Sequence, residues 1–124
     1  MKFSCEKHVL QSAIAIASRA TASKSPNSAL EGLLISAGEG VCITGYDLKK
    51  AIYTNIEANV SIMGESVVNA RLFGEMIRRM PEGMVFFTAD EQSIHVKCGK
   101  SEFNFIGISA EDFPELSQVD EINE

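Results

Sequence analysis

Apolar residues recur at helical spacing in two segments of the chain. In residues 6–20 and again in residues 70–80, the apolar side chains fall in one arc of a helical wheel, opposite the polar ones. These arcs contain Val9, Leu10, Ala13, Ile14, Ile16, Ala17 and Ala20 in the first segment and Leu72, Phe73, Met76, Ile77 and Met80 in the second. Pro81 and Gly83 end the second segment. The pattern therefore predicts two amphipathic helices, each with one face to bury.

Most of the remaining sequence is typical of short strands separated by turns. The predicted strands are residues 2–5, 29–36, 40–46, 49–57, 66–69, 84–88, 93–98 and 102–108. A strand, a helix and three strands thus occur twice, and residues 33–58 align with residues 85–110 at a constant offset of 52. We predict one α+β domain over residues 1–124, a duplicated β-α-β-β-β unit with two helices packed on antiparallel sheets.

The last predicted strand is apolar on both faces. Phe103 and Phe105 point to one side of it, while Ile106 and Ile108 point to the other. Such a strand is either central and covered, or an edge that pairs with a partner. Because it is the final strand of the sequence, we predict an edge.

Positive charge is concentrated in the two predicted helices, although the whole chain is acidic. The 124 residues carry a net charge of −6, with 11 basic and 17 acidic residues. Six of the 11 basic residues lie in the helices and the loop after the first, beside only Glu6 and Glu75 of the acids. The six are Lys7, Arg19, Lys24, Arg71, Arg78 and Arg79. Two such faces on one side of the molecule would attract phosphate groups through nonspecific, salt-dependent contacts, without reading bases.

The residues that could carry catalysis or bind a metal are scattered. The cysteines at positions 5, 42 and 98 have the surroundings of small buried residues, and Cys5 with His8 lacks the second pair that a zinc site needs. His8 and His95 lie in different halves, with no activated nucleophile at a turn beside either. We therefore expect no enzyme, no cofactor and no metal. Since the sequence shows no membrane-spanning run and no secretory signal, we expect a cytoplasmic protein.

Six short segments, spread over the whole chain, carry a resemblance to a known family. They are Met-Lys-Phe at residues 1–3, Gly-Leu-Leu-Ile at 32–35, Ile-Thr-Gly-Tyr-Asp-Leu at 43–48, Asn-Ala-Arg-Leu-Phe at 69–73, Met-Pro-Glu-Gly at 80–83 and Ser-Ala-Glu-Asp-Phe-Pro-Glu-Leu at 109–116. Together they resemble the first domain of the bacterial sliding clamp, the beta subunit of the DNA polymerase III holoenzyme. The resemblance implies the DNA-clamp fold, in which two protomers of three similar domains close into a ring around duplex DNA.

The same resemblance implies a non-enzymatic processivity factor for DNA replication. Helices line the hole of such a ring, and they contact double-stranded DNA without reading its sequence. Lys24, Arg71 and Arg78 match basic positions of the family that face DNA. We add Arg19, Arg79 and Lys7 from charge placement alone.

The resemblance also gives the predicted edge strand a partner. In the family the last strand of the first domain pairs with the third domain of the other protomer, so Phe103 and Phe105 resemble apolar interface positions and Lys100 an ion-pairing position. Leu72 and Glu102 stand where a charged and a basic residue are usual. The sequence ends at Glu124, where the family would continue into a second domain, so we expect this chain to be one domain of a longer protomer. In the family the polymerase and the clamp loader bind mainly between the second and third domains. The alternative is a protein-interaction module that assembles through its edge strand, with helix faces that are merely solvated.

Overall fold

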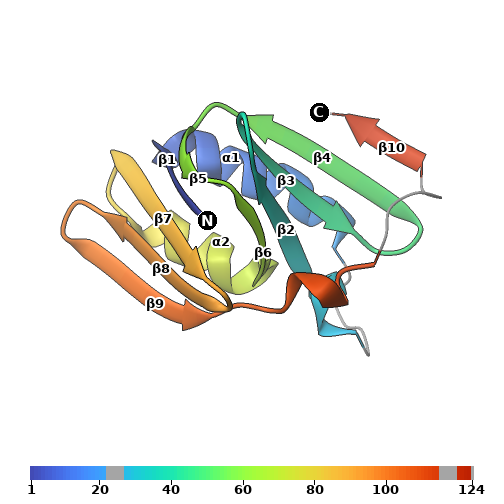
Figure 1. The fold of residues 1–124 in the computed structure, drawn as a ribbon. Coiled ribbons are helices and arrows are strands. Elements are labelled where there is room, and N and C mark those ends of the chain that lie inside the picture. The colour runs from blue at the N-terminus through green and yellow to red at the C-terminus, as the bar shows by residue number, and fades with distance from the viewer. Residues whose placement is uncertain (22–26, 115–119, 124) are drawn as a thin grey trace.

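The computed structural model describes residues 1–21, 27–114 and 120–123. In this part of the chain the elements are two α-helices, three short 3-10 turns and ten strands (Figure 1). The helices are α1 (Lys7–Ala17), which a 3-10 turn at Ser18–Ala20 extends, and α2 (Ala70–Arg79). The strands are β1 (Lys2–Glu6), β2 (Gly32–Ala37), β3 (Val41–Tyr46), β4 (Lys50–Ile56), β5 (Asn59–Ile62), β6 (Gly64–Asn69), β7 (Met84–Asp90), β8 (Ser93–Cys98), β9 (Ser101–Ile106) and β10 (Asp120–Asn123).

Two five-stranded sheets are built from these strands. Their orders are β5-β1-β7-β8-β9 and β10-β4-β3-β2-β6, and only the β10–β4 pair is parallel among the described strands. Each half of the chain gives its first strand to the other half, because β1 pairs with β7 and β6 pairs with β2. The 52-residue offset maps β3 onto β8 at both ends. The predicted α+β class and duplicated unit are confirmed, with an exchange of first strands between the halves.

Both helices pack against the same side of the two sheets and lie side by side (Figure 1). The apolar arcs are buried there, with Leu10 and Ile14 of α1 beside Phe73 of α2 in one core. The Phe73 ring meets the Phe87 ring edge-on with 5.8 Å between centroids, and Phe87 stacks on Phe3 at 4.9 Å. The polar faces of the helices are therefore directed away from the sheets. By length and hydropathy, no helix in the described part of the chain qualifies as a membrane span.

Two larger differences from the prediction occur in the first half of the chain, apart from shifts at the ends of other elements. The strand predicted from residue 29 begins at Gly32, because Asn27 accepts a hydrogen bond from the Ala29 N–H at 3.0 Å and starts a 3-10 turn over Ser28–Glu31. Residues 59–62, for which the sequence predicts no element, form β5 on the outer side of β1. A side-chain cap causes the first difference, and pairing with a distant strand causes the second.

β9 ends at Ile106, two residues earlier than predicted. The Gly107 N–H donates to the Gln92 carbonyl at 2.7 Å, and Ile108 then pairs with Val67 of the other sheet. A Cβ at residue 107 would lie 2.7 Å from the Val67 carbonyl oxygen, so the crossing requires a glycine. The prediction that Ile108 shares a strand face with Ile106 is therefore wrong. The prediction of an edge is confirmed, since β9 pairs only with β8 among the described residues.

Candidate nucleic-acid interface

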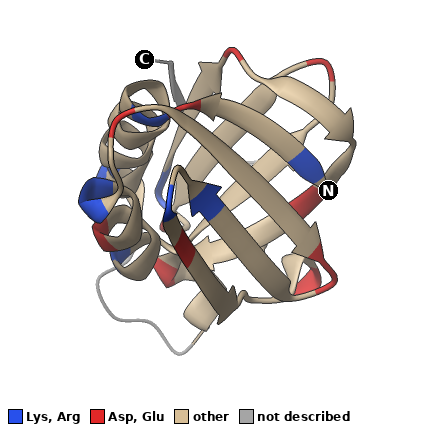
Figure 2. Ribbon diagram, turned by 90° about the vertical axis from the view of Figure 1, so that its left-hand side faces the viewer, with Lys and Arg blue, Asp and Glu red and all other residues tan. Residues whose placement is uncertain are grey.

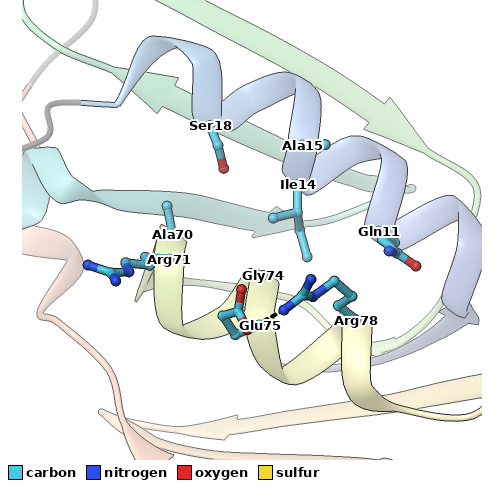
Figure 3. A pocket seen from close by; sticks show the side chains of 9 residues that line it. All are labelled: Gln11, Ile14, Ala15, Ser18, Ala70, Arg71, Gly74, Glu75 and Arg78. Atoms are coloured by element: carbon cyan, nitrogen blue, oxygen red, sulfur yellow. Dashed lines mark hydrogen bonds and ion pairs between the residues drawn. The ribbon is translucent and has the colours of Figure 1, made fainter.

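A groove lies between α1 and α2 on their polar faces (Figure 3). The two helices approach closely at Gly74, where an added Cβ would lie 3.6 Å from Ile14 Cγ2. Ile14 and Ala70 are buried, whereas the two arginines that line the groove are exposed. The lining residues are Gln11, Ile14, Ala15, Ser18, Ala70, Arg71, Gly74, Glu75 and Arg78. The groove thus has an apolar base and a basic rim.

α2 supplies three exposed arginines to this face. The helix begins after Asn69, whose Oδ1 accepts a hydrogen bond from the Leu72 N–H at 2.9 Å. Arg78 and Arg79 lie in its last turn, where the helix dipole favours positive charge. Arg71 lies in the first turn, where the dipole disfavours it. Arg71 therefore does not owe its place to helix stability.

Glu75 pairs with two of these arginines. Its Oε2 lies 2.7 Å from Arg78 Nη2 and 3.8 Å from Arg79 Nη2. These pairs were not predicted, although their spacings of three and four residues on a helix are the known signal for such pairs. Arg71, in contrast, has no ion-pair partner within the described residues.

The prediction that Lys7 lies on the exposed helix face is wrong. Lys7 is only 7% exposed, and its Nζ lies 3.5 Å from Glu82 Oε1 and 3.4 Å from the Arg78 carbonyl oxygen. Its backbone N–H donates to the Gly83 carbonyl at 2.9 Å. The lysine therefore joins the start of α1 to the end of α2, and it is not available to a ligand. No local signal could have shown this, because these partners lie more than 70 residues away.

The first helix contributes one exposed arginine. Arg19 lies in the 3-10 turn after α1 and is exposed, while the outward residues Ser12 and Ala15 of α1 are neutral. Lys24, the remaining predicted DNA contact, lies outside the described residues. The exposed described candidates are Arg19, Arg71, Arg78 and Arg79.

Acidic side chains are distributed differently from the arginines. Figure 2 shows Lys and Arg on the helix layer and on a few strands, and Asp and Glu mainly at turns, with one acidic position on a helix. Glu39 and Glu91, for example, are exposed at the β2–β3 and β7–β8 turns. The helix layer is therefore the part of the described surface best suited to attract an anion.

The predicted interface phenylalanines lie at the open edge of their sheet. Phe103 and Phe105 are half-buried against the core, and the Phe105 ring lies 6.3 Å from the Phe73 ring. Ile106 on the opposite face of β9 is 69% exposed, and Leu72 of α2 is 44% exposed. The edge thus combines unpaired backbone groups with apolar side chains on both faces.

The two charged residues predicted at this edge, Glu102 and Lys100, differ in their partners. Glu102 Oε1 lies 2.5 Å from Nε2 of His95 on the neighbouring strand. This hydrogen bond and the charge of His95 lower the pKa of Glu102. Lys100 is exposed in the turn before β9. The acid at position 102 is therefore paired within its own sheet, whereas Lys100 is accessible.

No cluster of metal ligands accompanies the basic face in the described part of the chain. Within residues 1–21, 27–114 and 120–123, no three His, Cys, Asp or Glu side chains gather as metal ligands would. Burial raises the pKa of the Cys5 thiol to about 12, which leaves it unreactive. The Cys98 thiol donates to the Pro81 carbonyl at 3.2 Å.

Known proteins match this chain over nearly its whole length. Residues 1–117 match the family described as DNA polymerase III beta subunit, N-terminal domain. The Beta sliding clamp of Micrococcus luteus is 32% identical over 120 residues, covering 96% of this chain and 39% of that protein. The Beta sliding clamp of Bacillus subtilis is 29% identical over 131 residues, covering 98% of this chain and 35% of that protein.

Solved structures show the same fold. A putative DNA polymerase III beta subunit from Eubacterium rectale superposes with a TM-score of 0.92 at 29% identity, covering 97% of this chain and 33% of that one. The DNA polymerase sliding clamp from Bacillus subtilis superposes with a TM-score of 0.89 at 29% identity, covering 95% and 34%. The chain thus spans about a third of the length of the relatives it matches.

Proposed function

Since the chain belongs to the DNA polymerase III beta subunit family, as its N-terminal domain, we propose that its helix face contacts duplex DNA within a sliding clamp. The domain would be a non-enzymatic part of a processivity factor that encircles DNA and tethers the replicative polymerase. Contacts to phosphates carry no sequence information, which is what movement along DNA requires. The observation that carries the proposal is that α1 and α2 lie side by side on one side of both sheets, with exposed arginines on the outward face.

The position of Arg71 supports a role outside the fold. An arginine in the first turn of a helix opposes the helix dipole, and Arg71 has no compensating acid within the described residues. A phosphate group would supply the missing negative charge. Arg19, Arg78 and Arg79 are exposed on the same helix layer and extend this surface.

The partners of the whole clamp follow from the family. We propose double-stranded DNA as the partner of this domain, and the polymerase and the clamp loader as partners of domains beyond this sequence. Lys24 stays a proposed DNA contact on the same grounds. Replication of a bacterial chromosome would place the protein in the cytoplasm.

The open edge of β9 is proposed as the contact to a second protomer. Unpaired strand edges are templates for another strand, and half-buried Phe103 and Phe105 would be covered by the partner. Leu72 and Lys100 are exposed and would flank this contact. The same observation supports the second candidate function, assembly with other proteins and no role in DNA binding.

A salt titration distinguishes the two functions. The wild-type chain and the Arg71→Ala plus Arg78→Ala variant are titrated with a fluorescent 20-base-pair duplex between about 20 and 150 mM salt, because each phosphate contact contributes about 0.9 to the slope of log K against log salt. We expect weak binding for the wild type and a shallower slope for the variant, by about 0.9 for Arg71 and by up to about 0.9 more for Arg78, which already pairs with Glu75. The matched control is Lys2→Ala plus Lys97→Ala, which removes two exposed charges from the sheet face opposite the helices.

Each result of this titration has a defined meaning. A change confined to the arginine variant supports DNA contact by the helix face. Equal slopes for the arginine variant and the control would mean that only net charge matters, and they would overturn the proposed surface. A wild-type chain without detectable duplex binding at low salt would favour the assembly function.

A further inference from the structure

A single carboxylate neutralises two of the three arginines on α2. Glu75 Oε2 lies 2.7 Å from Arg78 Nη2 and 3.8 Å from Arg79 Nη2. Figure 3 shows the Arg78 side chain lying along the groove with its guanidinium turned toward Glu75, whereas Arg71 is at the other end of the groove. Before any ligand binds, two of the cations at the end of α2 therefore already have a shared counter-ion.

We propose that Glu75 is an intramolecular competitor of DNA phosphate for Arg78 and Arg79. This inference rests on the proposed function, because it concerns the strength of the same contact. A phosphate that binds Arg78 must displace the Glu75 carboxylate. The net free energy of phosphate binding is therefore reduced by the free energy of the ion pair that is lost. The released Glu75 would also repel the phosphate.

The exposure of the pair makes such an exchange feasible. The side chains of Arg78 and Glu75 are 62% and 46% exposed, so a phosphate can reach the guanidinium without opening the core. Exposed ion pairs in water are weak and are screened by salt. The arginine can therefore alternate between the carboxylate and successive phosphates. Contacts of this kind hold DNA briefly, which suits a surface along which DNA slides.

Glu75 also has a simpler reading as a helix-stabilising residue. Pairs at spacings of three and four residues stabilise isolated helices slightly. That role predicts a small change in melting temperature and no change in DNA binding. Competition instead predicts tighter DNA binding when Glu75 is removed. The slope of log K against log salt therefore distinguishes the two roles.

The test compares Glu75→Gln with the wild-type chain in the duplex titration described above. Removing the competing carboxylate lets Arg78 contact phosphate more fully, so the slope steepens by up to about 0.9, and binding at 50 mM salt tightens by up to roughly tenfold. Glu39→Gln is the matched control, because it removes the same charge from the exposed β2–β3 turn. In an Arg78→Gln background the effect of Glu75→Gln should shrink, since its main partner is gone.

The outcomes separate this inference from the proposed function. Duplex binding by the wild type with equal slopes for Glu75→Gln and Glu39→Gln would overturn the competition and leave the DNA surface intact. Binding by Glu75→Gln where the wild type shows none would support the competition strongly. Absence of binding in both chains would overturn the competition together with the DNA surface.

Discussion

At the residue scale, Gly45 decides how closely α1 approaches the sheet. This residue lies buried in β3, and a Cβ added to it would lie 2.0 Å from the Ala17 carbonyl oxygen at the end of α1. That oxygen belongs to the backbone, so it cannot move without shifting the helix. We expect Gly45→Ala to lower the free energy of unfolding by about 3 kcal/mol, a large overpacking effect. For a domain of this size, thermal unfolding should show a melting temperature roughly 10 °C lower.

The matched control for this substitution is Gly38→Ala in the β2–β3 turn. A Cβ there would meet no atom within 4 Å. Its melting temperature should stay within a few degrees of the wild type, since substitutions without a new contact change stability by about 0.5 kcal/mol or less. Equal effects of the two substitutions would show that the approach of α1 to β3 is looser than described.

The burial and the partners of single side chains were the hardest features to predict from the sequence. Helical spacing places Lys7 and Arg71 on polar faces alike, yet Lys7 is buried under Glu82 and Arg71 is exposed. The burial of Lys7 depends on where the end of α2 lies, which is a tertiary property without a local pattern. Glu75 differs, because its pairing with Arg78 follows from their spacing on one helix.

At the element scale, the start of α2 depends on one side chain. Asn69 Oδ1 accepts the Leu72 N–H, which would otherwise lack a partner in the first turn. We expect Asn69→Ala to cost about 1 kcal/mol of stability, measured by urea unfolding. Glu6→Ala is the comparison at the start of α1, because Glu6 makes no side-chain cap hydrogen bond there. It should cost clearly less, and a larger loss for Glu6→Ala would contradict this assignment of the caps.

Helices and hairpin strands could be predicted because their signals are local. Periodicity and Pro81 place α2 within one residue of its observed end, and β3 and β8 have nearly the predicted bounds. β5 could not be predicted, because residues 59–62 become a strand only by pairing with β1, nearly sixty residues earlier. The early end of β9 likewise depends on Val67 of the other sheet.

At the scale of the whole molecule, the exchange of first strands leaves two related sheet edges. The 52-residue offset relates β4 to β9, and each is the last strand of one repeated β-α-β-β-β unit. β4 is covered, because β10 pairs with it in parallel along residues 50–53. β9 has no such neighbour among the described residues. The sequence predicts the open edge of β9 from its two apolar faces and from its place as the last predicted strand, although β10 follows it in the structure. The sequence contains no signal for the covering of β4.

Removal of β10 should open the edge of β4 in addition to the edge of β9. A chain truncated after Pro114 keeps Phe113 in its buried position next to Tyr46 but leaves β4 without its parallel neighbour. Because unpaired edges are templates for other strands, we expect the truncated chain to associate, β4 of one copy with β9 of the next. Sedimentation velocity should then show a weight-average coefficient that rises with concentration more steeply than for the whole chain. Ile106→Lys in the truncated chain places a charge on the β9 edge and should reverse this association. Identical sedimentation of the truncated and whole chains would show that β10 does not protect β4.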